Sequence, residues 1–165
     1  ELDQVWPEEF WNLGAEWPDK GDLFDTATKA HFGCRFPNGL EVEFVTEPNN
    51  SYVVRIEGDK GWIETTGRKV TASSPEIAKS VPGSGTRDQY INHYRNFIDC
   101  VKTRKTPNES VEIGHCITSV CHLGNIAMKL DRKIRWDAAK QTIVGDDQAA
   151  KMLERPHRGP WSYNV

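Results

Sequence analysis

The sequence has no long apolar segment: nowhere do more than three apolar residues follow one another. A membrane-spanning helix needs about 20 such residues, and the apolar part of a secretory signal needs about 7 to 15. We therefore expect no membrane segment and no secretory signal within these residues, and a cytoplasmic protein. Because the sequence begins with Glu1 rather than Met, an export signal in a longer parent protein stays open.

The sequence also lacks an excess of positive charge. It has 21 Lys and Arg against 24 Asp and Glu, a formal net charge of −3. Nucleic-acid-binding modules normally carry a basic stripe, and polybasic membrane anchors carry a cluster of Lys and Arg. We therefore expect neither nucleic acid nor a membrane surface as a partner.

Cysteine pairs with metal-ligand spacing are missing as well. The four cysteines are Cys34, Cys100, Cys116 and Cys121, and no C-x-x-C occurs. In a helix, the five-residue step between Cys116 and Cys121 turns their side chains about 140° apart. Neither a metal site nor a disulfide is expected, and four free thiols indicate a reducing compartment.

No complete catalytic or cofactor motif occurs in the sequence. P-loop, H-E-x-x-H and G-x-S-x-G patterns are all absent. The segment 83–88, Gly-Ser-Gly-Thr-Arg-Asp, resembles the start of a dinucleotide-binding turn, but no apolar strand precedes it and Asp88 stands where the third glycine belongs. We interpret it as a loop, and expect no catalytic and no cofactor-binding residue in this chain.

The first half of the sequence predicts strands. Residues 1–25 hold three tryptophans among prolines and glycines without a period, which predicts an irregular arm. Residues 26–72 alternate apolar and polar side chains, and Asn38-Gly39 is a strong hairpin signal. The expected strands lie at 29–36, 40–44, 52–57, 62–65 and around 70. Together they predict an antiparallel meander with one apolar face.

The second half, residues 86–154, predicts helices. A capping box, Thr86-x-x-Gln89, begins a helix that should end near residue 104. A second helix is expected over 112–130, and a third from the N-cap Asp146 to residue 154. Strands followed by helices predict a single α+β domain over residues 1–165, a mostly antiparallel open sheet with helices packed on one face.

Two features of this expected fold bear on function. The open face of the sheet carries His31 and Arg35, and the pattern leaves open whether it meets solvent or another subunit. His115 is expected in the first turn of the second helix, where free backbone N–H groups favour an anionic ligand. Ordinary packing of this histidine at a helix start is the alternative.

The helical half resembles one oxidoreductase family. The segment 94–107 is similar to its pattern N-F-x-D-C-V-[KR]-x-[RK]-x-x-P, and segments 111–115 and 121–127 also fit. So do residues 134–137, 145–147 and 155–156. The family is the glucose–fructose oxidoreductase/inositol dehydrogenase group, Gfo/Idh/MocA, whose C-terminal domain of the Bacteroidetes and Planctomycetes type is most similar. The resemblance covers roughly residues 22–161.

The resemblance implies an N-terminal Rossmann domain outside these residues, followed by a C-terminal substrate-binding and oligomerisation domain. The family transfers hydride between a sugar, polyol or related hydroxy compound and NAD(P), which the full-length parent and not this chain would bind. The family's G-x-G-x-x-G turn, its Glu-Lys-Pro lysine and its D-x-G-x-H helix are missing from these residues. The isolated chain is therefore expected to be inactive. The open sheet face is expected to form a homo-oligomer.

Candidate site residues follow from the same resemblance. His115, in the Gly-His pair of the last long helix, is the best candidate for a group near the substrate. His31, Arg35 and Trp62 are weaker candidates on the sheet. Two other functions remain as alternatives: a stand-alone carbohydrate-binding module, suggested by six tryptophans and an antiparallel sheet, and a structural oligomerisation domain.

Overall fold

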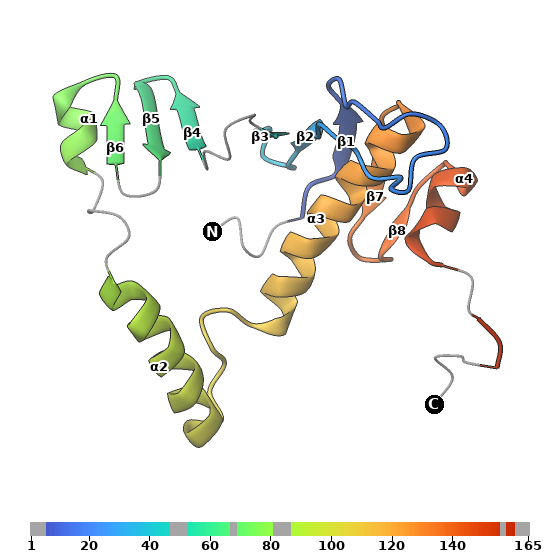
Figure 1. Ribbon diagram of the computed structural model, residues 1–165. Helices are drawn as coiled ribbons and strands as arrows, with labels where there is room; N and C mark the ends of the chain where they lie inside the picture. Colours follow the sequence, from blue (N-terminus) through green and yellow to red (C-terminus); the bar gives the residue numbers. More distant parts are fainter. Residues whose placement is uncertain (1–5, 47–52, 67–68, 81–86, 156–157, 161–165) are drawn as a thin grey trace. The chain divides into compact units, whose positions relative to one another are not determined.

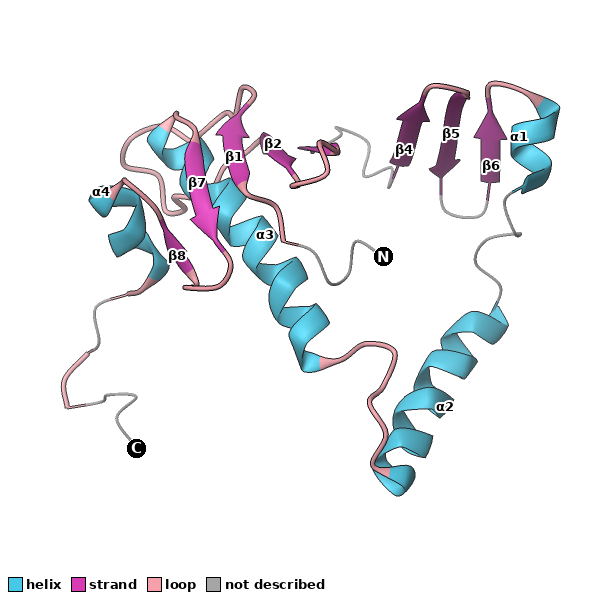
Figure 2. Ribbon diagram, turned by 180° about the vertical axis from the view of Figure 1, so that it is seen from behind, coloured by secondary structure: helices cyan, strands magenta, loops and turns pink. Residues whose placement is uncertain are grey.

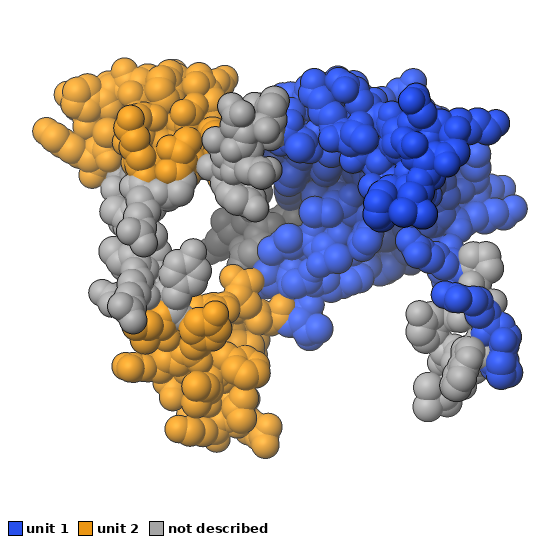
Figure 3. All heavy atoms as spheres, viewed as in Figure 1, with its two compact units in different colours: residues 1–46, 111–165 blue, residues 47–110 orange. Residues whose placement is uncertain are grey.

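The computed structural model describes residues 6–46, 53–66, 69–80, 87–155 and 158–160. Its helices and its two antiparallel sheets confirm the predicted α+β class. By internal contacts the chain divides into two compact units, residues 1–46 with 111–165 and residues 47–110 (Figure 3). The units therefore do not follow the expected order of a strand half and then a helical half.

The first unit is built on a five-stranded antiparallel sheet (Figure 1). Its strands, in spatial order, are β3 (Glu41–Val45), β2 (His31–Arg35), β1 (Glu9–Asn12), β7 (Ile134–Asp137) and β8 (Thr142–Ile143). Strand β1 is hydrogen-bonded on both sides, to β2 and to β7. The beginning and the end of the sequence thus meet in the middle of one sheet.

The prediction that residues 1–25 form only an irregular arm was wrong, because they contain β1. The side chain of Phe10 is fully buried and lies opposite Cys34 on β2 and Ile134 on β7. A four-residue strand is too short to show alternation among the surrounding prolines and tryptophans. Strands β7 and β8 were likewise not assigned from the sequence.

Helix α3 (Val111–Leu130) covers one face of this sheet and packs against β1 and β2 (Figure 2). The buried side chains that meet there are Phe10, Phe32, Cys34, Val120, Leu123, Ile126 and Ile134. Gly124 makes the close approach possible, because a Cβ at this position would lie 2.3–2.5 Å from carbons of the Phe32 ring. The glycine in this helix is therefore required by packing against β2.

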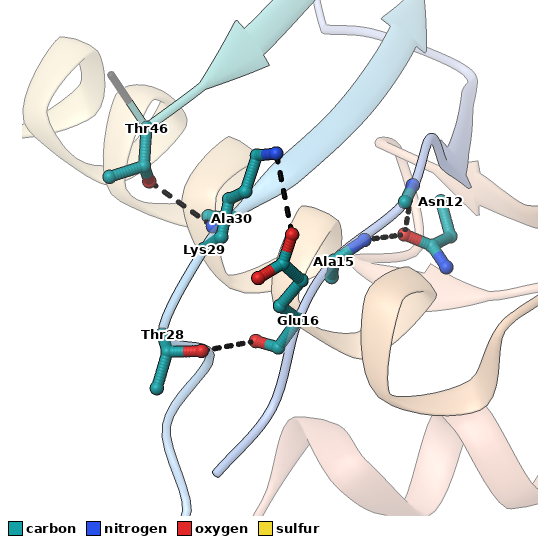
Figure 4. A network of polar contacts seen from close by, with 8 residues as sticks. Asn12, Ala15, Glu16, Thr28, Lys29, Ala30 and Thr46 are labelled. Atoms are coloured by element: carbon teal, nitrogen blue, oxygen red, sulfur yellow. Dashed lines mark hydrogen bonds and ion pairs between the residues drawn. The ribbon is translucent and has the colours of Figure 1, made fainter. Parts of the chain in front are cut away.

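Polar contacts hold the segment after β1 beside the start of β2 (Figure 4). The side-chain oxygen of Asn12 accepts hydrogen bonds from two backbone amides of the following turn, both at 3.0 Å. Glu16 and Lys29 bond through their backbones, and the amide of Ala30 donates to Thr46 Oγ1 at 3.1 Å. These bonds fix where β2 begins.

Helix α4 (Asp147–Ala150) begins at the predicted N-cap. Asp146 Oδ1 accepts from the backbone N–H of Ala149 at 3.0 Å, and Arg132 donates to both carboxylate oxygens at 2.8 and 2.9 Å. The hydrogen bond from Arg132 is the main reason that the pKa of Asp146 falls to about 2. The chain continues as a short 3₁₀ helix, η2 (Lys151–Leu153), close to the expected end.

The second unit holds a three-stranded antiparallel sheet and two helices. The sheet order is β4 (Val53–Gly58), β5 (Gly61–Thr66) and β6 (Lys69–Ala72), at the predicted positions. The prediction that these strands continue one meander with the strands at 29–36 and 40–44 was wrong, because they form a separate sheet. Helix α1 (Pro75–Ser80) was not expected, whereas α2 (Arg87–Thr103) was. Thr86 of the expected capping box and most of the segment 83–88 lie outside the described residues.

The two glycines of α3 provide a matched test of this packing. Gly124→Ala should destabilise the protein by about 1–3 kcal/mol, because the new methyl overpacks against Phe32. Gly114→Ala, on the same helix with nothing within 4 Å of the new Cβ, should stabilise it by roughly 0.8–1 kcal/mol. Urea denaturation of both variants measures the difference, and equal effects of the same sign would contradict the packing account.

The Arg132–Asp146 pair predicts a defined loss of stability in acid. Because the folded pKa of Asp146 is lowered from 3.8 to about 2, its contribution is present above pH 3.8 and is lost as the pH falls through about 2. Asp146→Asn keeps an oxygen for the cap but does not titrate, so it should be less stable at neutral pH and lose less between pH 3.8 and 2. Thermal denaturation across this range tests the prediction. Arg132→Gln should also reduce the loss of stability between pH 3.8 and 2. If the melting temperatures of both variants fell with pH as steeply as that of the wild type, the prediction would be contradicted.

Candidate functional site

His115 is the fifth residue of α3, since this helix begins one residue earlier than expected. Its backbone N–H therefore lies beyond the free amides of the first turn. The prediction that His115 is in the first turn was wrong by this margin. The side chain is exposed, so its imidazole, and not the helix terminus, is the polar group that a ligand would meet.

Two side chains hold the His115 ring. Its Nε2 lies 2.8 Å from Gln141 Oε1, and its ring centroid lies 5.4 Å from that of Trp6 in an edge-on arrangement. The Gln141 Nε2 donates to the carbonyl of Ala138 at 2.7 Å. Because a carbonyl oxygen only accepts, the amide oxygen must face His115, and His115 Nε2 must carry the proton.

A pocket of about 550 Å³ lies next to this histidine and shares Trp6 with it. Its wall also includes Glu8, Arg135, Trp136 and Asp137. The hydrogen bond from the backbone of Lys140 is the largest cause that lowers the pKa of Asp137, so this carboxylate is charged at neutral pH. Aromatic rings cover C–H groups while carboxylates accept from hydroxyls, so such a pocket can bind a small hydroxylated ligand.

His31 and Arg35 lie on the face of the five-stranded sheet that α3 does not cover. Their neighbours on β2, Phe32 and Cys34, point into the core, and successive strand residues face opposite ways. His31 Nε2 pairs with Glu43, and Arg35 pairs with Glu9. The structure therefore places these two candidates on the other side of the sheet from His115.

Glu9 is the centre of a small charge cluster on this open face. Besides Arg35 it pairs with Lys133, whose Nζ lies 3.2 Å from Glu9 Oε2. The hydrogen bond from Lys133 is the largest cause that lowers the pKa of Glu9. Lys133 also lies 5.4 Å from the ring centroid of Trp11. These side chains form cross-strand pairs, an arrangement typical of a polar sheet surface.

Trp62, the fourth candidate, belongs to the second unit. It lies on β5, and the guanidinium of Arg55 stands 4.4 Å from its ring centroid. Arg55 also donates to Glu57 at 2.6 Å and to Glu64 at 3.4 Å. Trp62 is thus a stacking partner of an arginine that two carboxylates already hold.

The sequence did not identify Trp6 and Gln141 as neighbours of His115, nor Trp136 as a neighbour of Trp6. Trp136 is 8% exposed, its indole Nε1 is buried with no hydrogen-bond partner among the described residues, and its ring centroid lies 5.9 Å from that of Trp6. None of the three stands within a recognisable motif with His115. Their contacts join a segment before β1, a helix and a hairpin, so the sequence offered no local signal.

The first unit thus has the architecture of an α+β domain in which a helix covers one face of an antiparallel sheet and a pocket lies beside Trp6. A family model for the C-terminal alpha/beta domain of an oxidoreductase family matches residues 24–163. The chain therefore belongs to the Gfo/Idh/MocA oxidoreductase family, as its C-terminal domain, which confirms the family that the sequence motifs resemble. Searches of curated proteins and of solved structures found no match.

The residues that the structure describes do not fit a nicotinamide cofactor. Dinucleotides bind where a glycine-rich turn joins parallel strands of a βαβ unit, whereas every pairing between the described strands is antiparallel. In this family NAD(P) binds in the N-terminal domain. No step of hydride transfer can therefore be assigned to these residues.

A metal centre is not formed either, within the described part of the chain. No group of three or more His, Cys, Asp or Glu side chains there could hold an ion. The thiol of Cys34 lies in the core, where burial raises its pKa to about 11, so it is not a thiolate.

Among the described helices, none has the length and apolar character to cross a bilayer.

Proposed function

We propose that this chain is the substrate-binding and assembly domain of an NAD(P)-dependent oxidoreductase that acts on a sugar, polyol or related hydroxy compound. The observation that carries the proposal is the family match over residues 24–163. The N-terminal domain of the parent would supply the nicotinamide, and the chain alone would be inactive. Its motifs favour the Bacteroidetes and Planctomycetes type of the family.

Within this domain His115 is the residue proposed to contact the substrate. Its ring is exposed, is held by Gln141 and Trp6, and lies next to the pocket that Trp6 and Trp136 line. An imidazole can exchange a proton with a substrate hydroxyl. His31, Arg35 and Trp62 are weaker candidates, because each is already engaged by an opposite charge or an arginine.

The open face of the five-stranded sheet is proposed to bind a second copy of the chain. Support comes from a row of charges across four strands, in which neighbours in register have opposite signs: Glu41, Arg35, Glu9 and Arg135. Consider two copies whose open faces meet, related by a twofold axis that lies between the faces and parallel to the strands. The charge row of the second copy then runs in the opposite direction to that of the first. Every carboxylate then meets a guanidinium, as a self-complementary interface requires.

The cytoplasm is the proposed compartment. Cys34, Cys100, Cys116 and Cys121 are all free in the structure, and two of them are buried. Secreted domains of this size commonly use their cysteines in disulfides, whereas cytosolic proteins keep them reduced. The free thiols thus support a reducing environment.

The oxidoreductase proposal predicts where the cofactor binds. In isothermal titration, NADH or NADPH should bind the full-length parent protein and should not bind the 165-residue chain. The reason is that the described residues form no dinucleotide site. Binding to neither protein would count against the proposal. A change of tryptophan fluorescence with glycans in that case would favour the stand-alone carbohydrate-binding module.

The assembly proposal predicts a charge-dependent oligomer. Light scattering at about 50 μM should show a dimer or a larger assembly of the chain. Arg135→Glu should shift it toward the monomer, because it reverses one sign in the row. Lys151→Glu makes the same change of charge on η2, outside the row, and should leave the assembly unchanged. A wild-type monomer, or equal effects of both variants, would contradict the proposal.

A further inference from the structure

Gln141 has a backbone conformation that its residue type disfavours. Its φ is +52°, in the left-handed region, at the end of the turn that joins β7 to β8. Hairpin turns place glycine or asparagine at such a position, because a longer side chain is strained there. A strained residue that persists in a structure points to a role for its side chain.

The side chain of Gln141 is anchored at both ends of its amide. The nitrogen donates to the Ala138 carbonyl within the same turn, at 2.7 Å, and the oxygen accepts from His115 Nε2, at 2.8 Å. The first bond fixes which way the amide faces. The second then places an acceptor at His115 Nε2, which requires a proton on this nitrogen. Gln141 therefore selects one tautomer of His115, with its proton on Nε2.

The turn itself does not need this side chain. Asp137 Oδ1 already accepts from the backbone amides of Ala139 and Lys140, at 3.1 and 3.0 Å. Trp136 pairs with Ile143, and Asp137 with Thr142, across the hairpin. A glycine at position 141 would satisfy the backbone at least as well. The choice of glutamine is thus explained by its contact with His115.

The opposite nitrogen of the ring is the one left for a ligand. Within the described part of the chain, His115 Nδ1 has no hydrogen-bond partner, and the side chain is exposed. With Nε2 protonated, neutral Nδ1 carries a lone pair and acts as an acceptor. The edge-on contact with Trp6 limits how the ring can turn.

We propose that Gln141 is a positioning residue that holds His115 in its Nε2–H tautomer and so presents Nδ1 as the acceptor for a hydroxyl group of the substrate. The inference rests on the role proposed above for His115. It adds the direction of the hydrogen bond: the substrate hydroxyl donates to Nδ1. It also adds the residue outside α3 that sets this direction.

Ring-nitrogen NMR of the ¹⁵N-labelled chain tests the proposal without any turnover. At about pH 8.5, two units above the ordinary histidine pKa of about 6.5, the tautomer of a neutral imidazole can be read from its two nitrogen shifts. His115→Ala assigns the His115 signals among the five histidines. The wild type should show the Nε2–H tautomer alone. Gln141→Gly, which keeps the left-handed backbone and removes the amide, should give a mixture like that of an unstructured histidine peptide.

Gln141→Glu serves as the rescue: it loses the hydrogen bond to the Ala138 carbonyl, but both oxygens of its carboxylate are acceptors, so an acceptor for Nε2–H is kept. Gln141→Glu should restore the single Nε2–H tautomer of His115. If Gln141 mattered only for the turn, the Gly and Glu variants would not differ in the tautomer of His115. In the full-length enzyme, Gln141→Gly should lower kcat/KM by about 10- to 100-fold. A mixture in the wild type, or a single Nε2–H tautomer that persists in Gln141→Gly, would overturn the inference. Failure of NADH binding would instead overturn the proposed function and leave the tautomer result standing.

Discussion

Helix α3 and strand β2 approach each other closely because position 124 carries no side chain, and the first unit depends on this contact. The ring of Phe32 occupies the space that a Cβ would need. With α3 at this distance, Leu123 and Ile126 join Phe10 and Ile134 in one buried cluster, which includes residues of two strands far apart in the sequence. One glycine thus allows a single core to join the beginning and the end of the chain.

The same packing places the candidate residues of the unit on different sides of its sheet. Because α3 covers one face of the sheet, alternate residues of β2 are divided between the core and the open face. His115 lies with the helix-covered side, next to Trp6 and its pocket. His31 and Arg35 lie on the open side among cross-strand ion pairs. His115 therefore lies on the other side of the sheet from the self-association row, although Glu9 and Arg135 of that row also line the pocket beside Trp6.

Elements with a clear local period were predictable from the sequence. The alternation around residues 31–35 and 41–45, and the helical spacing of 111–130, gave β2, β3 and α3 to within two residues. Strand β1 was missed, because its four residues are a strand only through pairing with β2 and β7. In the site, His115 could be named from the sequence. Its partner Gln141, 26 residues further on, could not.

The α+β class, the family and the choice of His115 as a candidate follow from the amino-acid sequence, since periodicity and motifs are local properties of the chain. The fold was needed to show that residues 1–46 and 111–165 belong to one compact unit, and on which side of its sheet His31, Arg35 and His115 lie. It was also needed to show that the amide oxygen of Gln141 faces Nε2 of His115. These depend on contacts between segments far apart in the sequence, such as the one that brings the β7–β8 turn to α3. No local pattern encodes them.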